Sequence, residues 1–142
     1  MMEQKDNQLV SGWLSLTNAY VTITGELDVA MQQRHDLTLK EFYVLLFLYQ
    51  TPEKKLKLQQ LQKMVGLSQS AMSRLVARFE AKGCGALQRE VCLEDRRNIY
   101  TAITEIGENK LVKALDTFHS ILKKALAETK FQDGIGALFL SK

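Results

Sequence analysis

Hydrophobic residues recur at alternating steps of four and three along residues 7–33, which predicts a long helix. The apolar positions are Leu9, Trp13, Leu16, Tyr20, Ile23, Leu27 and Ala30. They form an a/d seam sustained for about three heptads, so one flank of the helix requires a partner. Two glycines and the β-branched residues of 21–24 lower the intrinsic helicity, so packing must stabilise it. The partner is either a second copy of the chain or the core of the same domain.

A second helix is predicted from Thr38, where the sequence carries a clear start signal. Thr38 and Glu41 have the spacing of a capping box, and Leu37 and Phe42 occupy the positions of a hydrophobic staple. Residues 42–49 are apolar on nearly every side, which places this helix in the middle of the fold. Pro52 ends the helix because it cannot continue the hydrogen-bond ladder.

The next segment has the pattern of two short helices joined by a tight turn. After a possible brief strand in residues 54–58, a third helix is expected over residues 59–65, with Leu61, Met64 and Val65 buried. Gly66 stands where a helix C-terminal glycine is expected, and Ser68 is the N-cap of the following helix. This arrangement predicts a helix-turn-helix.

The second helix of this pair, within residues 67–83, has two contrasting faces. Its buried stripe is predicted to contain Met72, Leu75, Val76 and Phe79. The opposite face carries Gln69, Ser70, Ser73, Arg74, Ala77, Arg78 and Lys82. Small polar side chains let a helix approach base edges, and arginine can bind guanine or phosphate. An ordinary amphipathic helix is the alternative, but its surface usually mixes Glu with Lys, whereas Glu80 is the only acid here. The pattern therefore favours a DNA-reading helix.

Beyond Gly83 the hydrophobic period changes from helical to alternating. Residues 87–91 and 98–103 are predicted to be two strands of a hairpin, joined by residues 93–97. The joining segment contains Asp95-Arg96-Arg97. Adjacent arginines on an exposed loop can enter a minor groove or lie along phosphates, and Asp95 can hold one of them in place. With the preceding helices, the hairpin predicts a winged helix-turn-helix.

Three segments form a recognisable combination: Leu67 to Val76, the wing run Glu94-Asp95-Arg96-Arg97, and Ile103-Thr104-Glu105-Ile106-Gly107. In these motifs the chain resembles the MarR (multiple antibiotic resistance regulator) family of bacterial transcription factors. The resemblance implies a homodimer with interlocked terminal helices, recognition helices in successive major grooves and wings in the adjacent minor grooves. One departure is that residues 83–87 contain two additional residues compared with the family pattern. A longer or kinked link to the wing is therefore expected.

A last long helix is predicted from Thr104, which is a suitable N-cap. Glu105 and Glu108 follow in its first turn, where the helix dipole favours negative charge. Its apolar seam contains Leu111, Leu115, Phe118, Leu122 and Ala125, and Val112, Ile121 and Leu126 widen it. Residues 135–140 are also apolar and are expected to need a partner surface. The predicted organisation is a helical dimerisation region of residues 1–36 and 104–142 around a winged helix-turn-helix of residues 37–103.

Composition and charge agree with this organisation. The chain has 142 residues, of which 46% are hydrophobic and 25% charged, as is usual for one globular domain. Residues 52–103 contain ten Lys or Arg and five Asp or Glu, a net +5, whereas the remainder is −2. Such an excess fits a nucleic-acid surface, although a solvated lysine-rich face is an equal alternative. No signal peptide or membrane span is evident, so a cytoplasmic location is expected.

The sequence offers little catalytic or metal-binding chemistry. Cys84 and Cys92 flank the first predicted strand, roughly 20–26 Å apart if the intervening residues are extended, and their spacing is not a zinc motif. Incidental thiols are favoured over an oxidant sensor. Two histidines, His35 and His119, are too few for a metal site unless carboxylates such as Asp36, Glu41 and Asp116 assist. We find no motif of an enzyme active site and expect no cofactor.

These observations predict a dimeric MarR-type transcriptional regulator. It is expected to repress a palindromic operator in double-stranded DNA and to be released by a small-molecule effector or a modification. Predicted roles are base contacts for Gln69, Ser70, Ser73 and Arg74, a phosphate contact for Arg78, and wing contacts for Arg96 and Arg97. The alternative function is a winged-helix interaction module that binds a protein or RNA partner.

Overall fold

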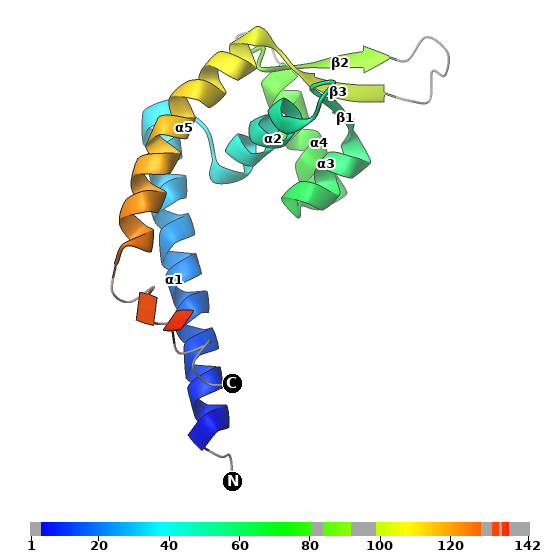
Figure 1. Ribbon diagram of the computed structural model, residues 1–142. Coiled ribbons are helices and arrows are strands. Elements are labelled where there is room, and N and C mark those ends of the chain that lie inside the picture. The colour runs from blue at the N-terminus through cyan, green and yellow to red at the C-terminus, as the bar shows by residue number, and fades with distance from the viewer. Residues whose placement is uncertain (1–3, 81–83, 92–98, 129–131, 134, 137–142) are drawn as a thin grey trace.

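The computed structural model describes residues 4–80, 84–91, 99–128, 132–133 and 135–136. It is mainly helical, with one small sheet, as the sequence predicts. Figure 1 shows a lobe, made of α2, α3, α4 and the sheet, at the upper end of an arm made of α1 and α5. In chain order the elements are α1 (Gln4–His35), α2 (Leu39–Gln50), β1 (Lys55–Lys57), α3 (Leu58–Val65), α4 (Gln69–Glu80), β2 (Leu87–Val91), β3 (Ile99–Ile103) and α5 (Glu105–Leu126).

The sheet has three antiparallel strands in the order β1-β3-β2. In β3, Thr101 lies opposite Leu56 of β1 on one side and Arg89 of β2 on the other. The predicted hairpin is therefore present, and the brief strand suggested by the sequence pairs with its second strand. This pairing attaches the hairpin to the segment between α2 and α3.

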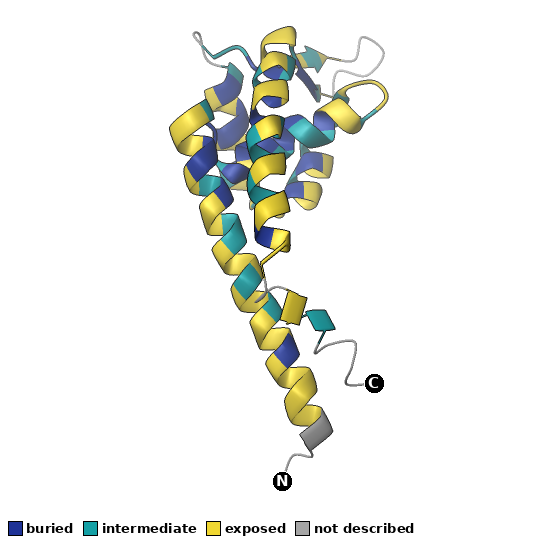
Figure 2. Cartoon of the chain, turned by 60° about the vertical axis from the view of Figure 1, so that its left-hand side comes forward, coloured by how far each residue is buried: buried dark blue, intermediate teal, exposed yellow. Residues whose placement is uncertain are grey.

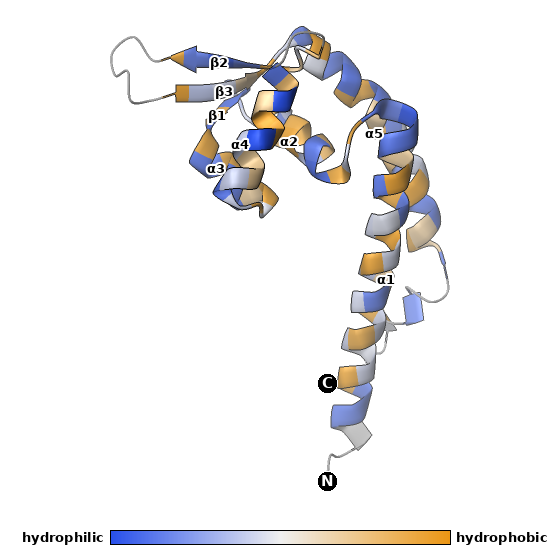
Figure 3. Cartoon of the chain, turned by 180° about the vertical axis from the view of Figure 1, so that it is seen from behind, coloured by the Kyte–Doolittle hydropathy of each residue, from blue (hydrophilic) through white to orange (hydrophobic). Residues whose placement is uncertain are grey.

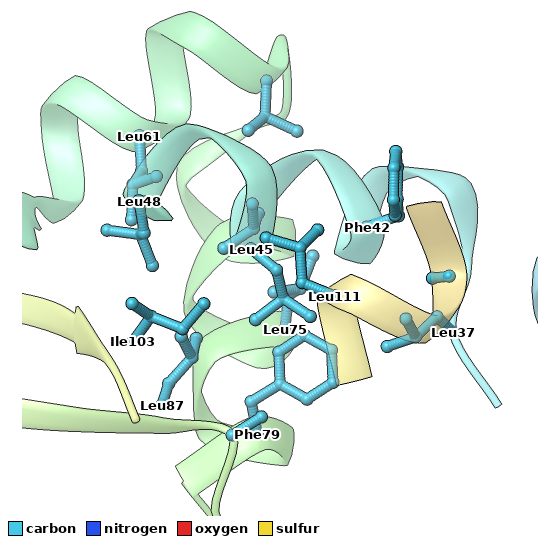
Figure 4. Close-up of a cluster of buried hydrophobic side chains, with 14 of the residues drawn as sticks. Leu37, Phe42, Leu45, Leu48, Leu61, Leu75, Phe79, Leu87, Ile103 and Leu111 are labelled. Atoms are coloured by element: carbon cyan, nitrogen blue, oxygen red, sulfur yellow. The ribbon is translucent and has the colours of Figure 1, made fainter. Parts of the chain in front are cut away.

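Helix α2 lies in the middle of the core, as its apolar sequence predicts. Phe42, Leu45 and Leu48 have no solvent exposure and lie among side chains of α3, α4, β3 and α5 (Figure 4). The predicted capping box is confirmed, because the Glu41 N–H donates to Thr38 Oγ1 over 3.1 Å and the Thr38 N–H donates to Glu41 Oε1 over 2.7 Å. A further bond, from the Leu39 N–H to Asp28 Oδ1 over 2.8 Å, ties the start of α2 to α1.

One core prediction for the helix-turn-helix is wrong. Leu61 and Val65 form the buried face of α3, but Met64 is 48% exposed. Met64 lies one residue before Val65 and therefore about 100° away from it around the helix.

The apolar seam of α1 packs within its own chain at one end of the helix and is exposed at the other. Near its C-terminal end, Leu27, Ala30 and Met31 are buried, and α1 packs there on α5 and α2 of the same chain. Along its N-terminal half, Leu9, Trp13 and Tyr20 of the same seam are between 48% and 63% exposed. Figure 2 shows this half extending beyond the lobe, largely exposed, and Figure 3 shows hydrophobic positions along it. Packing within one chain therefore accounts for only part of the seam.

Of the link between α4 and β2, the structure describes residues 84–86. Gly85 has a φ of +63°, a conformation that favours glycine. Thr104 donates its N–H to the Ala86 carbonyl over 3.0 Å and its hydroxyl to the Gly85 carbonyl. The Thr104 hydroxyl also accepts the Gly107 N–H, which confirms the predicted N-cap of α5. Gly85 and Ala86 are thus fixed against the start of α5.

Candidate nucleic-acid interface

The turn between α3 and α4 has the geometry that the sequence predicts. Gly66 has a φ of +76° and donates its N–H to the Gln62 carbonyl over 2.9 Å. Ser68 then caps α4, because its hydroxyl accepts the Ala71 N–H over 3.2 Å and its carbonyl accepts the Met72 N–H over 2.9 Å. A left-handed glycine followed by a serine cap sets the direction in which α4 leaves the turn.

Burial along α4 fixes which of its faces is presented outward. The predicted stripe is confirmed, since Met72, Leu75, Val76 and Phe79 are all buried. The residues on the opposite face that the structure describes are all exposed: Gln69, Ser70, Ser73, Arg74, Ala77 and Arg78. Lys82 lies outside the described residues. The exposed face is therefore small, polar and basic, as DNA reading requires.

The single acid of α4 is turned toward the sheet. Glu80 lies 3.0 Å from Arg89 Nε of β2, and its side chain is 21% exposed. The exposed face thus carries no acidic side chain within Gln69–Glu80. In the part of the chain that the structure describes, Arg74 has no ion-pair partner, so its guanidinium is available to a ligand.

Arg78 differs from the other predicted contact residues. Its guanidinium lies 3.1 Å from Glu41 and donates to the Asp36 carbonyl over 3.3 Å. It is therefore already held at the α1–α2 junction, although half of its side chain is exposed. Sequence reasoning did not identify Glu41 as its partner.

The base of the wing, where β1, β2 and β3 pair, contains an ion pair and two lysines near an aromatic ring. Lys55 pairs with Glu90 over 3.2 Å, and Lys55 and Lys57 lie 5.3 and 5.9 Å from the ring centre of Tyr100. The predicted contact residues Arg96 and Arg97 and their predicted support Asp95 lie outside the described residues, as does Cys92. Their roles remain predictions.

The remaining candidate residues do not form a common site. His35 and His119 lie on different elements: the His35 ring is 2.7 Å from Thr117 Oγ1, whereas His119 is exposed. Burial lowers the pKa of His35, and nearby Arg34, Lys110 and Lys113 lower it further.

Cys84 is half-buried against the core. The described residues contain no group of three His, Cys, Asp or Glu side chains placed to hold a metal. Across these same ranges, no helix is long and apolar enough to cross a membrane.

An apolar groove of about 510 Å³ lies along the arm, next to the lobe. Tyr43 of α2 contributes to one wall. The other walls come from α1 and α5, and the lining residues are Trp13, Leu16, Thr17, Tyr20, Ile23, Thr24, Leu27, Phe118, Leu122 and Leu126. The exposed seam of α1 is therefore continuous with a groove between α1 and α5.

The central part of the chain matches a known protein family. Residues 35–97 match the model of the MarR family, which confirms the resemblance seen in the motifs. A search of curated proteins found no match.

Several solved structures share the fold. The regulator Sco3205 from Streptomyces coelicolor, solved in complex with DNA, is 23% identical, with a TM-score of 0.76 over 99% of this chain and 87% of that one. BldR from Sulfolobus solfataricus is 20% identical, with a TM-score of 0.75 over 99% of this chain and 100% of that one. CouR from Rhodococcus jostii RHA1, bound to p-coumaroyl-CoA, is 22% identical, with a TM-score of 0.67 over 77% of this chain and 73% of that one. At these identities the likeness shows a shared fold.

Proposed function

We propose that this chain, whose residues 35–97 match the MarR family, represses transcription as a dimer bound to a palindromic operator. The observation that carries the proposal is the exposed face of α4. That face is small, polar and basic, and Glu80, the one acid of α4, is paired with Arg89 of the sheet. A helix with this surface, held by a capped turn, can approach base edges closely.

Within this function, Gln69, Ser70, Ser73 and Arg74 are assigned to base edges. Arg74 is the strongest candidate for a specific contact, because an exposed arginine can bind guanine through two parallel hydrogen bonds. Arg96 and Arg97 are assigned to the wing, where they would contact the minor groove or phosphates, with Asp95 supporting one of them.

The dimer is inferred from the N-terminal half of α1. Trp13 and Tyr20 are 61% and 63% exposed, and on a neighbouring face Leu14 and Val21 are 54% and 63% exposed. A helix that is apolar on adjacent faces and extends beyond its own fold requires a partner surface. A second copy would satisfy both faces and would place two recognition helices about 34 Å apart, one DNA turn.

Release by a small molecule is assigned to the groove that Tyr43, Phe118 and the α1 seam line. Its walls are largely apolar and it lies where the arm meets the lobe, so a ligand bound there can alter the angle between them. The similar fold of CouR is solved with p-coumaroyl-CoA bound. An effector with an apolar, planar portion suits the aromatic side chains of this groove.

The experiment that tests the proposal starts from DNA fragments of the source genome selected by the purified protein. Binding of a selected fragment and of a scrambled duplex is then titrated from about 50 to about 200 mM salt. We expect a steep loss of affinity with salt and a preference for the selected fragment of at least about a thousandfold. Equal affinity for both duplexes would overturn the proposal and favour a module that binds a protein or RNA partner.

A further inference from the structure

The C-terminal end of α1 and the start of α2 form a junction that receives basic side chains from two other helices. This α1–α2 corner consists of residues 35–41. Lys110 of α5 donates to the His35 carbonyl over 3.4 Å, and Arg78 of α4 donates to the Asp36 carbonyl over 3.3 Å. Carbonyls at a helix C-terminus attract cations because the helix dipole is negative there. The recognition helix is therefore attached directly to the end of the arm helix.

Glu41 provides the second attachment of Arg78 to the corner. Its side chain is only 4% exposed, and its carboxylate lies 3.1 Å from the Arg78 guanidinium while also accepting the Thr38 N–H. A buried carboxylate that loses its counter-charge is strongly destabilised. In the portion of the chain that the structure describes, Arg78 is the only cation paired with Glu41. Movement of Arg78 to a DNA phosphate would leave this carboxylate uncompensated.

Both attachment points of Arg78 belong to the α1–α2 corner. Asp36 has a φ of +54° and forms the turn itself, and Glu41 lies in the first turn of α2. Helix α1 has 32 residues and is therefore about 48 Å long. A small rotation of the arm, caused by a partner copy or an effector, would shift the Asp36 carbonyl and Glu41, and Arg78 with them.

We propose that Arg78 is a positioning residue that couples the arm to the recognition helix through Glu41 and Asp36. This inference rests on the proposed DNA-binding function and replaces the phosphate contact predicted for Arg78 from the sequence. It makes operator affinity depend on Glu41, a side chain too deeply buried to touch DNA.

The test is a double-mutant cycle of the full chain with Arg78→Gln, Glu41→Gln and both together. Glutamine at position 41 can still accept the Thr38 N–H, so the capping box is retained. We expect each single variant to lose operator affinity about tenfold and the double variant to lose no more than either, because both remove the same interaction. Lys123→Gln on α5 is the control for loss of one positive charge and should bind like the parent protein.

The salt dependence separates positioning from phosphate contact. A positioning residue leaves the slope of log affinity against log salt unchanged, whereas loss of a phosphate contact lowers the slope by about one. Arg78→Lys adds a second criterion, because the guanidinium reaches Glu41 and the Asp36 carbonyl through two different nitrogens, whereas lysine has one nitrogen on a differently shaped side chain. Positioning predicts weaker binding by Arg78→Lys at an unchanged slope. Parent-like binding by Arg78→Lys and Glu41→Gln, with a reduced slope for Arg78→Gln, would overturn the proposal.

Hydrogen exchange provides a readout that does not require DNA. We expect the backbone amides of α4 to exchange faster in Arg78→Gln and in Glu41→Gln, by a similar factor, than in Lys123→Gln. Unchanged exchange in α4 in both variants would also overturn the positioning role. If the parent protein showed no sequence preference for DNA, the proposed function would fail, while the exchange measurement would still decide whether Arg78 holds α4.

Discussion

Gly107 packs against the backbone carbonyl of Ala86 so closely that no side chain fits between them. A Cβ on Gly107 would overlap that oxygen and would lie 2.8 Å from Cγ1 of Ile103. The same Ala86 carbonyl accepts the Thr104 N–H over 3.0 Å. The first turn of α5 is thereby held against the link that leads from α4 to the wing.

Gly107→Ala is expected to destabilise the fold. The added methyl group would force the first turn of α5 away from Ala86, and overpacking of this kind costs about 1–3 kcal/mol. Chemical denaturation measures the change in the free energy of unfolding. Gly25→Ala in α1 is the matched control, because a Cβ there meets no atom within 4 Å, and it should stabilise by up to about 1 kcal/mol. Equal stability of the two variants would contradict the close approach.

Arg74→Ala is expected to weaken operator binding more than Ser70→Ala. Loss of a bidentate contact to guanine costs about 1–3 kcal/mol, whereas a serine hydroxyl contributes a single hydrogen bond worth about 1 kcal/mol. Titration of each variant against the selected operator and against single-base variants measures the loss of affinity and of discrimination. Full operator affinity in Arg74→Ala would remove this residue from the assigned contacts.

Trp13→Glu is expected to convert the proposed dimer to a monomer. A carboxylate in the exposed seam would be placed in an apolar interface without a counter-charge, which is strongly unfavourable. Sedimentation equilibrium measures the mass in solution, and circular dichroism checks that the helices remain. Ser15→Glu introduces the same charge on the opposite side of α1 and should leave the mass unchanged. A parent-like mass for Trp13→Glu would place the interface elsewhere.

His35 is expected to make stability depend on pH. Its pKa is lowered from 6.5 mainly by burial, so the unfolded chain binds a proton at a higher pH than the folded one does. The contribution of neutral His35 is therefore complete above pH 6.5 and is lost as the pH falls toward the lowered value. Denaturation from about pH 7.5 to about pH 5.5 should show a shallower decline for His35→Gln than for the parent. His119→Gln is the control for the loss of one imidazole. If the free energy of unfolding of His35→Gln and of the parent declined in parallel with falling pH, the predicted effect of His35 would be refuted.

Local signals in the sequence predicted the elements that carry the proposed site. The Thr38 capping box, the left-handed Gly66 and the Ser68 cap each involve residues within four positions of one another, so their spacing alone identifies them. Helical periodicity likewise assigned the buried stripe of α4. Each of these features depends on residues that are close together in the sequence, so it can be predicted without the tertiary fold.

Contacts between distant segments could not be predicted in this way. The Arg78–Glu41 pair joins residues 37 positions apart and depends on the turn at Asp36, which no sequence motif marked. Met64 follows Leu61 by three residues, a spacing that predicts a shared buried face, yet its side chain is 48% exposed. The apolar positions of the α1 seam recur evenly in the sequence, whereas Leu27 and Ala30 are buried and Leu9, Trp13 and Tyr20 are exposed.

The exposed half of the α1 seam has a consequence for how such a protein would respond to its own abundance. If two chains must pair to cover Trp13 and Tyr20, the folded assembly is stabilised by mass action, and its stability rises with the number of chains in the cell. Occupancy of a two-fold operator would then increase more steeply than in proportion to expression. A cell could therefore relieve repression by lowering synthesis of the protein, without any effector.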